Sequence, residues 1–179
     1  MPKNFLQSNW YVITGGPSSG KTTVLEELSK LGYLVYPEAA RVFIDKEMKK
    51  GKSIEEIRSD EAEFQRKVLK IKINVEKSAP KDKIVFFDRA IPDSIAYYQI
   101  AGLDSKEVLK SCLKKTYRKI FFLEQLPFNK DYARIENGET IKKLNRLFKK
   151  SYKSLGYKII NITAASVTKR VQKILKEIN

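Results

Sequence analysis

The sequence contains no histidine, and this absence excludes several kinds of active site. A chain without imidazole cannot form a Ser-His-Asp or Cys-His catalytic group or an H-E-x-x-H zinc site. Any acid–base chemistry must therefore come from carboxylates or lysine. The single cysteine, Cys112, excludes a disulfide within the chain and is typical of a reducing compartment.

Long hydrophobic runs are missing as well. The longest, such as Ile84–Phe87 and Ile120–Leu123, fall far short of the ~20 residues that span a bilayer. The N-terminal stretch MPKNFLQSNW lacks the apolar segment of a signal peptide. We therefore expect a cytoplasmic protein without a membrane span. A length of 179 residues, 42% of them hydrophobic, predicts a single domain over residues 1–179 with a substantial core.

The net charge of +15 is concentrated in the second part of the chain. Residues 104–179 hold 19 basic and 7 acidic side chains. Such an excess favours anionic partners, nucleic acid among them. However, 28 of the 36 basic residues are lysines dispersed along helical patterns, as on a solvated surface. Nucleic acid is therefore an alternative partner, but the dispersed lysines favour a solvated surface over a nucleic-acid interface.

The stretch ITGGPSSGKTT, residues 13–23, contains the P-loop pattern G-x-x-x-x-G-K-[ST]. It follows an apolar, strand-like run and precedes a helical pattern, the context that the motif requires. In such a loop, backbone N–H groups bind nucleotide phosphates, the lysine reaches the β- and γ-phosphates, and the threonine hydroxyl binds Mg²⁺. The predicted nucleotide-binding residues are Gly15, Gly16, Pro17, Ser18, Ser19, Gly20, Lys21, Thr22 and Thr23.

An aspartate ends a second buried run, KIVFFDR. Residues 84–87 predict a buried strand with Asp88 at its carboxyl end, where open α/β sheets bind ligands. Asp88 and Thr22 are therefore the predicted Mg²⁺ ligands, with Asp88 in the role of a Walker B carboxylate. The alternative is that Asp88 caps the next helix, although Asp93 could fill that role instead.

A glutamate follows the second predicted strand, Tyr33–Tyr36, in the stretch VYPEAAR. Glu38 is placed to meet a substrate hydroxyl, or alternatively to interact with the dipole of the following helix. Arg41 lies on the same helix face and either forms a structural ion pair with Glu38 or binds substrate together with it. Four aromatic residues flank the proposed cleft and either sandwich a ring or belong to the core: Tyr36, Phe43, Tyr97 and Tyr98.

Strand-like and helical patterns alternate, which favours an α/β fold with a parallel sheet and helices on both faces. A capping box at Ser53 predicts one long helix up to Lys77, Gly156 is the predicted end of a helix that begins near Glu139, and Ser166 is the predicted cap of the last helix. The expected strands are Trp10–Thr14, Tyr33–Tyr36, Lys83–Asp88, Lys119–Leu123 and Tyr157–Ile162.

The motifs ITGGPSSGKTT, PEAAR, FFDRAIPDSIAYYQIAG and SLGYKIINI, in this order, resemble those of NadR-like P-loop domains of the AAA-type ATPase group. That group includes the kinase domain of NadR-type nicotinamide riboside kinases. The resemblance implies a P-loop NTPase fold of the nucleoside/nucleotide-kinase type. This fold is a three-layer α-β-α sandwich with a five-stranded parallel sheet in the order 2-3-1-4-5. It also implies a lid over the phosphates, which we expect at the polar, irregular residues 127–138.

The same resemblance makes Glu38 the candidate base, Asp88 the candidate metal ligand, and Arg89 and Arg134 the candidates for stabilising phosphate charge. The alternative for Arg134 is a solvated loop arginine. Two departures are expected. The chain begins shortly before the P-loop, so the adenylyltransferase domain of NadR proteins should be missing, and the Asp88–Arg89 pair differs from the pattern of a true riboside kinase.

Together these features predict an ATP- and Mg²⁺-dependent phosphotransferase acting on a small hydroxyl-bearing acceptor such as a nucleoside. The alternatives are a nucleotide-binding regulator with ATPase or GTPase activity and a nucleic-acid 5′-kinase. ATP is favoured over GTP, because the aspartate in FNKDY comes one place too early for the guanine-reading N-K-x-D pattern. The predicted catalytic residues are Lys21, Glu38, Asp88, Arg89 and Arg134, and the predicted acceptor-binding residues are Glu38, Arg41 and Arg89.

Overall fold

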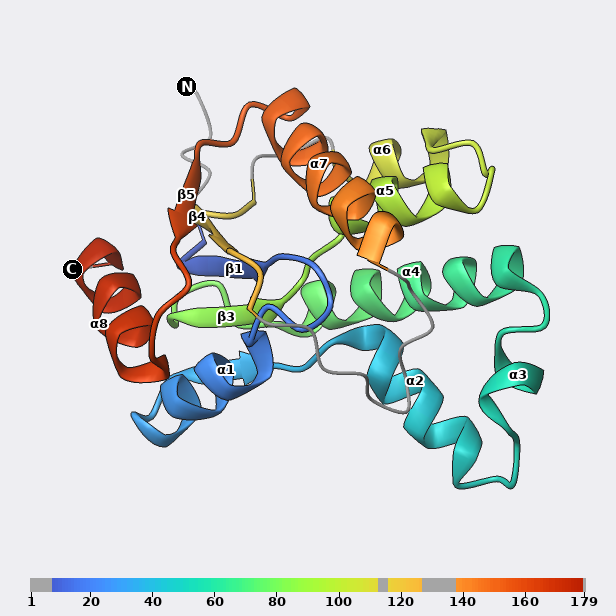
Figure 1. The fold of residues 1–179 in the computed structure, drawn as a ribbon, viewed down its shortest axis with the longest axis horizontal. Coiled ribbons are helices and arrows are strands. Elements are labelled where there is room, and N and C mark those ends of the chain that lie inside the picture. The colour runs from blue at the N-terminus through green and yellow to red at the C-terminus, as the bar shows by residue number, and fades with distance from the viewer. Residues whose placement is uncertain (1–7, 113–115, 127–137, 179) are drawn as a thin grey trace.

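The computed structural model describes residues 8–112, 116–126 and 138–178. Five parallel strands form one sheet in the order β2-β3-β1-β4-β5, which confirms the order that the family resemblance implied (Figure 1). β1 lies at the centre of the sheet, between β3 and β4. The strands are β1 (Trp10–Thr14), β2 (Leu34–Tyr36), β3 (Val85–Asp88), β4 (Lys119–Leu123) and β5 (Ile159–Ile162).

Helices connect the strands and cover both faces of the sheet, as the alternating pattern predicts. Within the described residues they are α1 (Lys21–Lys30), α2 (Ala39–Met48), α3 (Ile54–Ile57), α4 (Glu61–Ser78), α5 (Asp93–Ile100), α6 (Lys106–Ser111), α7 (Gly138–Ser154) and α8 (Val167–Ile178). Figure 1 shows α1 and α8 together on one side of the sheet, with α4, α5 and α7 on the other.

The central strand is apolar along both faces because helices cover both. Tyr11 and Ile13 belong to a core cluster with residues of α1 and α8, whereas Trp10 and Val12 belong to a second cluster that includes residues of α4 and α7. All five residues of β1 are buried. This continuous burial is typical of a parallel strand enclosed between two layers of helices.

One helix prediction is wrong. The capping box forms at Ser53 as predicted, but the helix it begins, α3, ends at Ile57. The side chain of Asp60 then accepts the backbone N–H of Glu63 at 2.8 Å and caps a second helix, α4. A second N-cap inside the predicted segment therefore divides it in two.

The other predicted helix ends agree with the structure. Gly156 adopts a left-handed conformation (φ 78°) just after α7. The hydroxyl of Ser166 accepts the N–H of Lys169 at 3.4 Å at the start of α8. Of the predicted lid, residues 127–137 lie outside the described residues, and Gly138 begins α7. Within the described ranges, no helix has both the length and the apolar character needed to cross a membrane.

Candidate active site

The loop between β1 and α1 has the backbone of a phosphate-binding loop. Gly15 adopts φ 141°, and a Cβ at this position would lie 2.5 Å from the backbone oxygen of Leu123 in β4, so only glycine fits. Gly20 also has a positive φ of 80° and immediately precedes α1. The first N–H groups of α1 have no partner within the helix, and together with the helix dipole they favour an anion at this end.

Lys21 is the first residue of α1, as predicted, and it is buried. Its Nζ donates to the backbone oxygens of Gly15 at 3.1 Å and Gly16 at 3.0 Å, and it lies 3.4 Å from the hydroxyl of Ser19. The ammonium group is thus folded over the loop. It can reach phosphate oxygens bound there without leaving the site.

Arg170 braces the loop from α8, and sequence reasoning missed it. It is only 2% exposed, and its guanidinium donates to three backbone oxygens on three different segments. Nη1 donates to Ser19 in the loop, Nη2 to Glu124 after β4 at 2.8 Å, and Nε to Thr163 after β5 at 3.0 Å. One signal was available: Arg170 lies on the buried face of α8, beside Val171 and one turn before Ile174.

Asp88 lies at the carboxyl edge of the sheet beside the loop. It ends β3 and pairs in register with Ile13 of β1. Asp88 is buried, and its Oδ1 has no hydrogen-bond partner among the described residues. Burial raises the pKa of Asp88 to about 6, although the nearby Lys21 opposes the shift. Asp88 does not cap α5, which begins at Asp93.

Asp93 is not a conventional cap either. It is the first residue of α5 and is completely buried. Its carboxylate accepts the backbone N–H of Ala90 at 2.8 Å and the hydroxyls of Thr14 and Tyr152. These bonds link the start of α5 to β1 and α7.

The unpartnered Asp88 oxygen fits a magnesium ion. Thr22, an exposed residue in the first turn of α1, carries a hydroxyl and is the other candidate ligand. Among the described residues, no group of three or more potential metal-ligating side chains exists. Mg²⁺ is typically held by one or two protein oxygens together with phosphate oxygens and water, so this small donor set suits an ion that arrives with a nucleotide.

Glu38 turns away from the helix that it precedes. It is the N-cap residue of α2 but makes no capping hydrogen bond with its side chain. Instead, its Oε1 lies 3.1 Å from Nε of Arg89, as a charge contact. Burial alone would raise its pKa, but the charges of four cationic neighbours outweigh burial and lower the pKa below its usual value: Arg89, Lys21, Lys72 and Arg41. Glu38 is therefore ionised at neutral pH.

Arg89 is fixed in place by its backbone and by its surroundings. Its φ of 62° is left-handed, which costs a non-glycine residue roughly 1–2 kcal/mol. Its Nη1 donates to the Tyr97 hydroxyl at 2.6 Å, and its guanidinium faces the rings of Tyr97 and Phe148 at 5.4 and 4.9 Å. Strain of this kind is concentrated at functional sites, where the surroundings must hold it.

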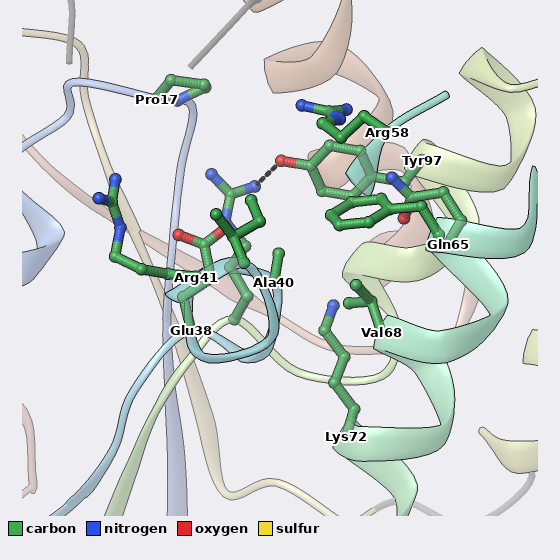
Figure 2. A pocket seen from close by; sticks show the side chains of 12 residues that line it. Pro17, Glu38, Ala40, Arg41, Arg58, Gln65, Val68, Lys72 and Tyr97 are labelled. Atoms are coloured by element: carbon green, nitrogen blue, oxygen red, sulfur yellow. Dashed lines mark hydrogen bonds and ion pairs between the residues drawn. The ribbon is translucent and has the colours of Figure 1, made fainter. Parts of the chain in front are cut away.

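A pocket opens beside the phosphate loop and contains both Glu38 and Arg89 (Figure 2). The space, including its open mouth, is about 600 Å³. Lys72 points into it from α4, and its buried Nζ donates to the backbone oxygen of Ala90 at 3.1 Å and to Ser94 Oγ at 3.0 Å. The pocket is lined by Pro17, Glu38, Ala40, Arg41, Ile44, Arg58, Phe64, Gln65, Val68, Lys72, Arg89 and Tyr97.

Of the four aromatic residues that flanked the proposed cleft, Tyr97 lines this pocket. The other three make core contacts. Tyr36 stacks on Phe87 at 5.3 Å, Phe43 packs on Phe64 at 5.8 Å, and Tyr98 is buried. Arg41 lines the pocket one turn after Glu38 and acts on the Glu38 charge.

Sequence reasoning missed the residues that α4 contributes to the pocket, and Arg134 lies outside the described residues. Lys72 could have been found, because it lies on the same helix face as the buried Val68 and Leu69, where a lysine is unexpected. The loop, the sheet order and the carboxyl-edge pocket together define a P-loop fold.

The chain belongs to the AAA domain family, whose model matches residues 10–170. No curated protein matches the sequence. Three solved structures illustrate the likeness of the fold. A NadR protein in complex with NR has a TM-score of 0.69 and 16% identity, over 96% of this chain and 50% of that chain. This chain thus spans about half the length of that NadR protein. The family match and the NadR structure confirm the resemblance to NadR-like P-loop domains.

The match to each of the other two structures extends over almost the whole of both chains. Deoxyadenosine kinase from M. mycoides has a TM-score of 0.64 and 16% identity, over 95% of this chain and 98% of that chain. Thymidylate kinase from Ehrlichia chaffeensis has a TM-score of 0.65 and 17% identity, over 94% of this chain and 97% of that chain. At these identities the likeness establishes the fold.

Proposed function

We propose that the protein is a P-loop phosphotransferase that moves the terminal phosphoryl group of ATP to a hydroxyl of a small acceptor. One observation supports this most directly. A single pocket contains Pro17 of the phosphate loop and the ionised Glu38 paired with Arg89. A hydroxyl bound in that pocket would lie between a carboxylate and the end of a bound triphosphate.

In this proposal the acceptor oxygen forms a bond to the γ-phosphorus, and the bond between that phosphorus and the bridging oxygen of ADP breaks. The hydroxyl proton passes to Glu38 and then to solvent. Mg²⁺, when bound, neutralises phosphate charge. Loop N–H groups and Lys21 hold the phosphates, Asp88 and Thr22 would hold the ion, and Arg89 both orients Glu38 and adds positive charge at the point of transfer.

The lowered pKa of Glu38 determines what this residue can contribute. The carboxylate is ready to accept a hydrogen bond from a hydroxyl, so it would orient the attacking oxygen. It is a weak base, however, and a loose phosphoryl-transfer transition state demands little proton transfer early on. Positioning and charge therefore account for most of the expected rate.

The solved structures with this fold support the same reaction class. They include a deoxyadenosine kinase with bound dATP, a thymidylate kinase, and a NadR protein in complex with NAD and AMP-PNP. Nucleoside kinases and nucleotide kinases both transfer a phosphoryl group from a nucleoside triphosphate. The shared chemistry supports the proposal, and the acceptor must be identified by experiment.

The test is a screen for acceptor-dependent ADP formation with Mg²⁺ and ATP, using nucleosides, nucleoside monophosphates, sugars and 5′-hydroxyl oligonucleotides. We expect one class of small hydroxyl-bearing acceptors to accelerate ADP release and to appear as a phosphorylated product. Slow hydrolysis that no acceptor accelerates would instead favour a nucleotide-binding regulator. Acceleration by oligonucleotides alone would favour a nucleic-acid 5′-kinase.

A further inference from the structure

Helix α7 differs from the other long helix of the chain in its charge. Its 17 residues include six basic residues and one acidic residue, Glu139. The 18 residues of α4 include five basic and three acidic residues, and its exposed Lys67 pairs with Glu63 at 2.7 Å. The acidic residues of α4 therefore offset much of its positive charge, whereas most of the positive charge of α7 has no counterpart on the same helix.

The fold gathers the cations of α7 on one side. At about 100° per residue, five of the six fall within an arc of about 100°, and they extend over about 16 Å of the helix axis. The opposite side holds the buried Leu144, Phe148 and Tyr152, which belong to the core. The five exposed cations are called the basic face of α7: Lys142, Lys143, Arg146, Lys150 and Lys153.

The basic face has no anionic partner in the part of the chain that the structure describes. None of its five side chains makes an ion pair or a side-chain hydrogen bond there. Lys149, the sixth cation, is half-buried, with its Nζ 4.3 Å from the ring centre of Phe122. Even with Glu139 counted, five positive charges less one leave the face at +4. Like charges one turn apart destabilise a helix slightly, and a bound polyanion would remove that repulsion.

The two ends of α7 lie at different edges of the sheet. Near its start, α7 packs against the phosphate loop: a Cβ at Gly16 would lie 3.0 Å from Ile141 Cγ2 and 2.7 Å from Asn145 Oδ1. Directly after α7, at the edge where β4 and β5 begin, is a hollow of about 1120 Å³ including its open mouth. The exposed Arg118 and Lys158 line this hollow. Positive charge therefore continues beyond the end of the helix.

From this arrangement we infer that the basic face of α7 is a docking surface for the phosphate backbone of a nucleic acid, bound without regard to base sequence. Lys142, Arg146 and Lys150 follow one another at about 6 Å along the helix axis, so they present a row of charges to a linear polyanion. Phosphate contacts of this kind supply affinity but carry no sequence information. The face lies outside the acceptor pocket, so the inference goes beyond the proposed phosphotransfer.

The same surface is poorly suited to a membrane or to a protein partner. A helix that binds at a membrane surface inserts its apolar side, but the apolar side of α7 is buried in the core. Within the described ranges, the exposed large apolar side chains all lie outside α7. Protein interfaces are depleted in lysine and enriched in aromatic residues, whereas four of the five residues of the basic face are lysines. A nucleic-acid backbone requires only the charge.

The test is fluorescence anisotropy with labelled DNA duplexes of two unrelated sequences that carry 5′ phosphates. Mg²⁺ and a saturating non-hydrolysable ATP analogue occupy the phosphate loop, and the 5′ phosphates remove the hydroxyl that a 5′-kinase would accept. We expect both duplexes to bind with similar affinity. The logarithm of the binding constant should fall linearly with the logarithm of the salt concentration, with a slope of about −4.5 if all five cations contact phosphates.

The combined variant Lys142→Gln/Arg146→Gln/Lys150→Gln removes three charges from the basic face and keeps good helix formers. Its salt slope should become shallower by about three, and its affinity at low salt should fall at least about tenfold. The matched control removes three charges from exposed lysines of α2 and α4 and should keep the wild-type slope: Lys46→Gln/Lys70→Gln/Lys77→Gln. Binding driven by net charge alone would weaken equally in both variants.

Thermal unfolding checks that each variant is folded. A further variant, Lys142→Arg/Lys150→Arg, keeps both charges and should bind like the wild type. Absence of duplex binding, equal losses in the two triple variants, or loss of binding in the arginine variant would overturn the inference. Tighter binding to phosphatidylserine vesicles or to polyglutamate than to DNA would also overturn it, because the partner would then be a membrane or an acidic protein.

Discussion

Replacing Arg170 should weaken both the fold and nucleotide binding, because its guanidinium connects three segments behind the phosphate loop. Arg170→Met fills a similar volume but leaves the backbone oxygens of Ser19, Glu124 and Thr163 without these donors. Each bond to a charged donor is worth about 1.5–3 kcal/mol. Removing a buried charge recovers part of its desolvation cost, so we expect a net loss of about 2–4 kcal/mol.

For a chain of this size, that loss corresponds to a decrease in Tm of roughly 5–15 °C. Thermal unfolding measures it, and calorimetry below the transition measures ATP affinity. We expect weaker ATP binding even where the variant is fully folded, because Ser19 loses the contact that fixes the loop. Arg170→Lys should recover little, since one ammonium cannot reach three separated oxygens.

Lys173→Met is the matched control on α8. Lys173 is exposed, and its Nζ donates to the backbone oxygen of Asn161 at 2.9 Å. The Lys173→Met variant should retain the wild-type Tm and ATP affinity. A wild-type Tm for Arg170→Met, or wild-type ATP affinity at a temperature where both proteins are folded, would refute the bracing role of Arg170.

Three further changes probe other parts of the site. Lys21→Ala should reduce turnover below detection in the ADP assay, because it removes the ammonium that is folded over the loop. Turnover by Lys21→Ala at the wild-type rate would count against this loop as the working site. Asp88→Asn should weaken the dependence on Mg²⁺ more than ATP affinity, measured by titrating the ion; an unchanged Mg²⁺ requirement would argue against Asp88 as a ligand. Burial raises the pKa of Glu76 to about 7, so the native state holds its proton between pH 4.5 and 7 while the unfolded state releases it. Stability should therefore fall as pH rises through that range, by at most about 3 kcal/mol from this group. Glu76→Gln should melt higher than the wild type at pH 8 and equally near pH 4.5, and equal melting temperatures at both pH values would contradict the shift.

Much of the phosphate site was predictable because its determinants are local. The loop pattern, the flanking strand and the start of α1 lie within about a dozen consecutive residues, and the backbone at Gly15 and Gly20 has the positive φ that such a loop requires. Asp88 was also predictable, because an aspartate that ends a buried parallel strand must lie at the carboxyl edge of the sheet.

The remaining features depend on contacts between distant segments. Arg170 reaches Ser19 across 151 positions of the chain, and no local pattern indicates that a loop needs a brace from the last helix. The break between α3 and α4 was missed because two N-cap signals, at Ser53 and Asp60, fall within one helical pattern, and each of them begins a separate helix. The Glu38–Arg89 pair joins the ends of two adjacent strands, so its existence depended on the strand order.

The most direct test of the account compares the wild type with Glu38→Gln in acceptor-dependent ADP formation, using one acceptor identified in the screen. Glu38→Gln keeps the shape and loses the charge paired with Arg89. We expect transfer to the acceptor to fall about 100-fold, near the lower end of the range for loss of a general base, because the lowered pKa makes Glu38 a weak base. Binding of ATP should change little. Unimpaired acceptor phosphorylation by Glu38→Gln would contradict the central claim that this carboxylate receives the acceptor hydroxyl.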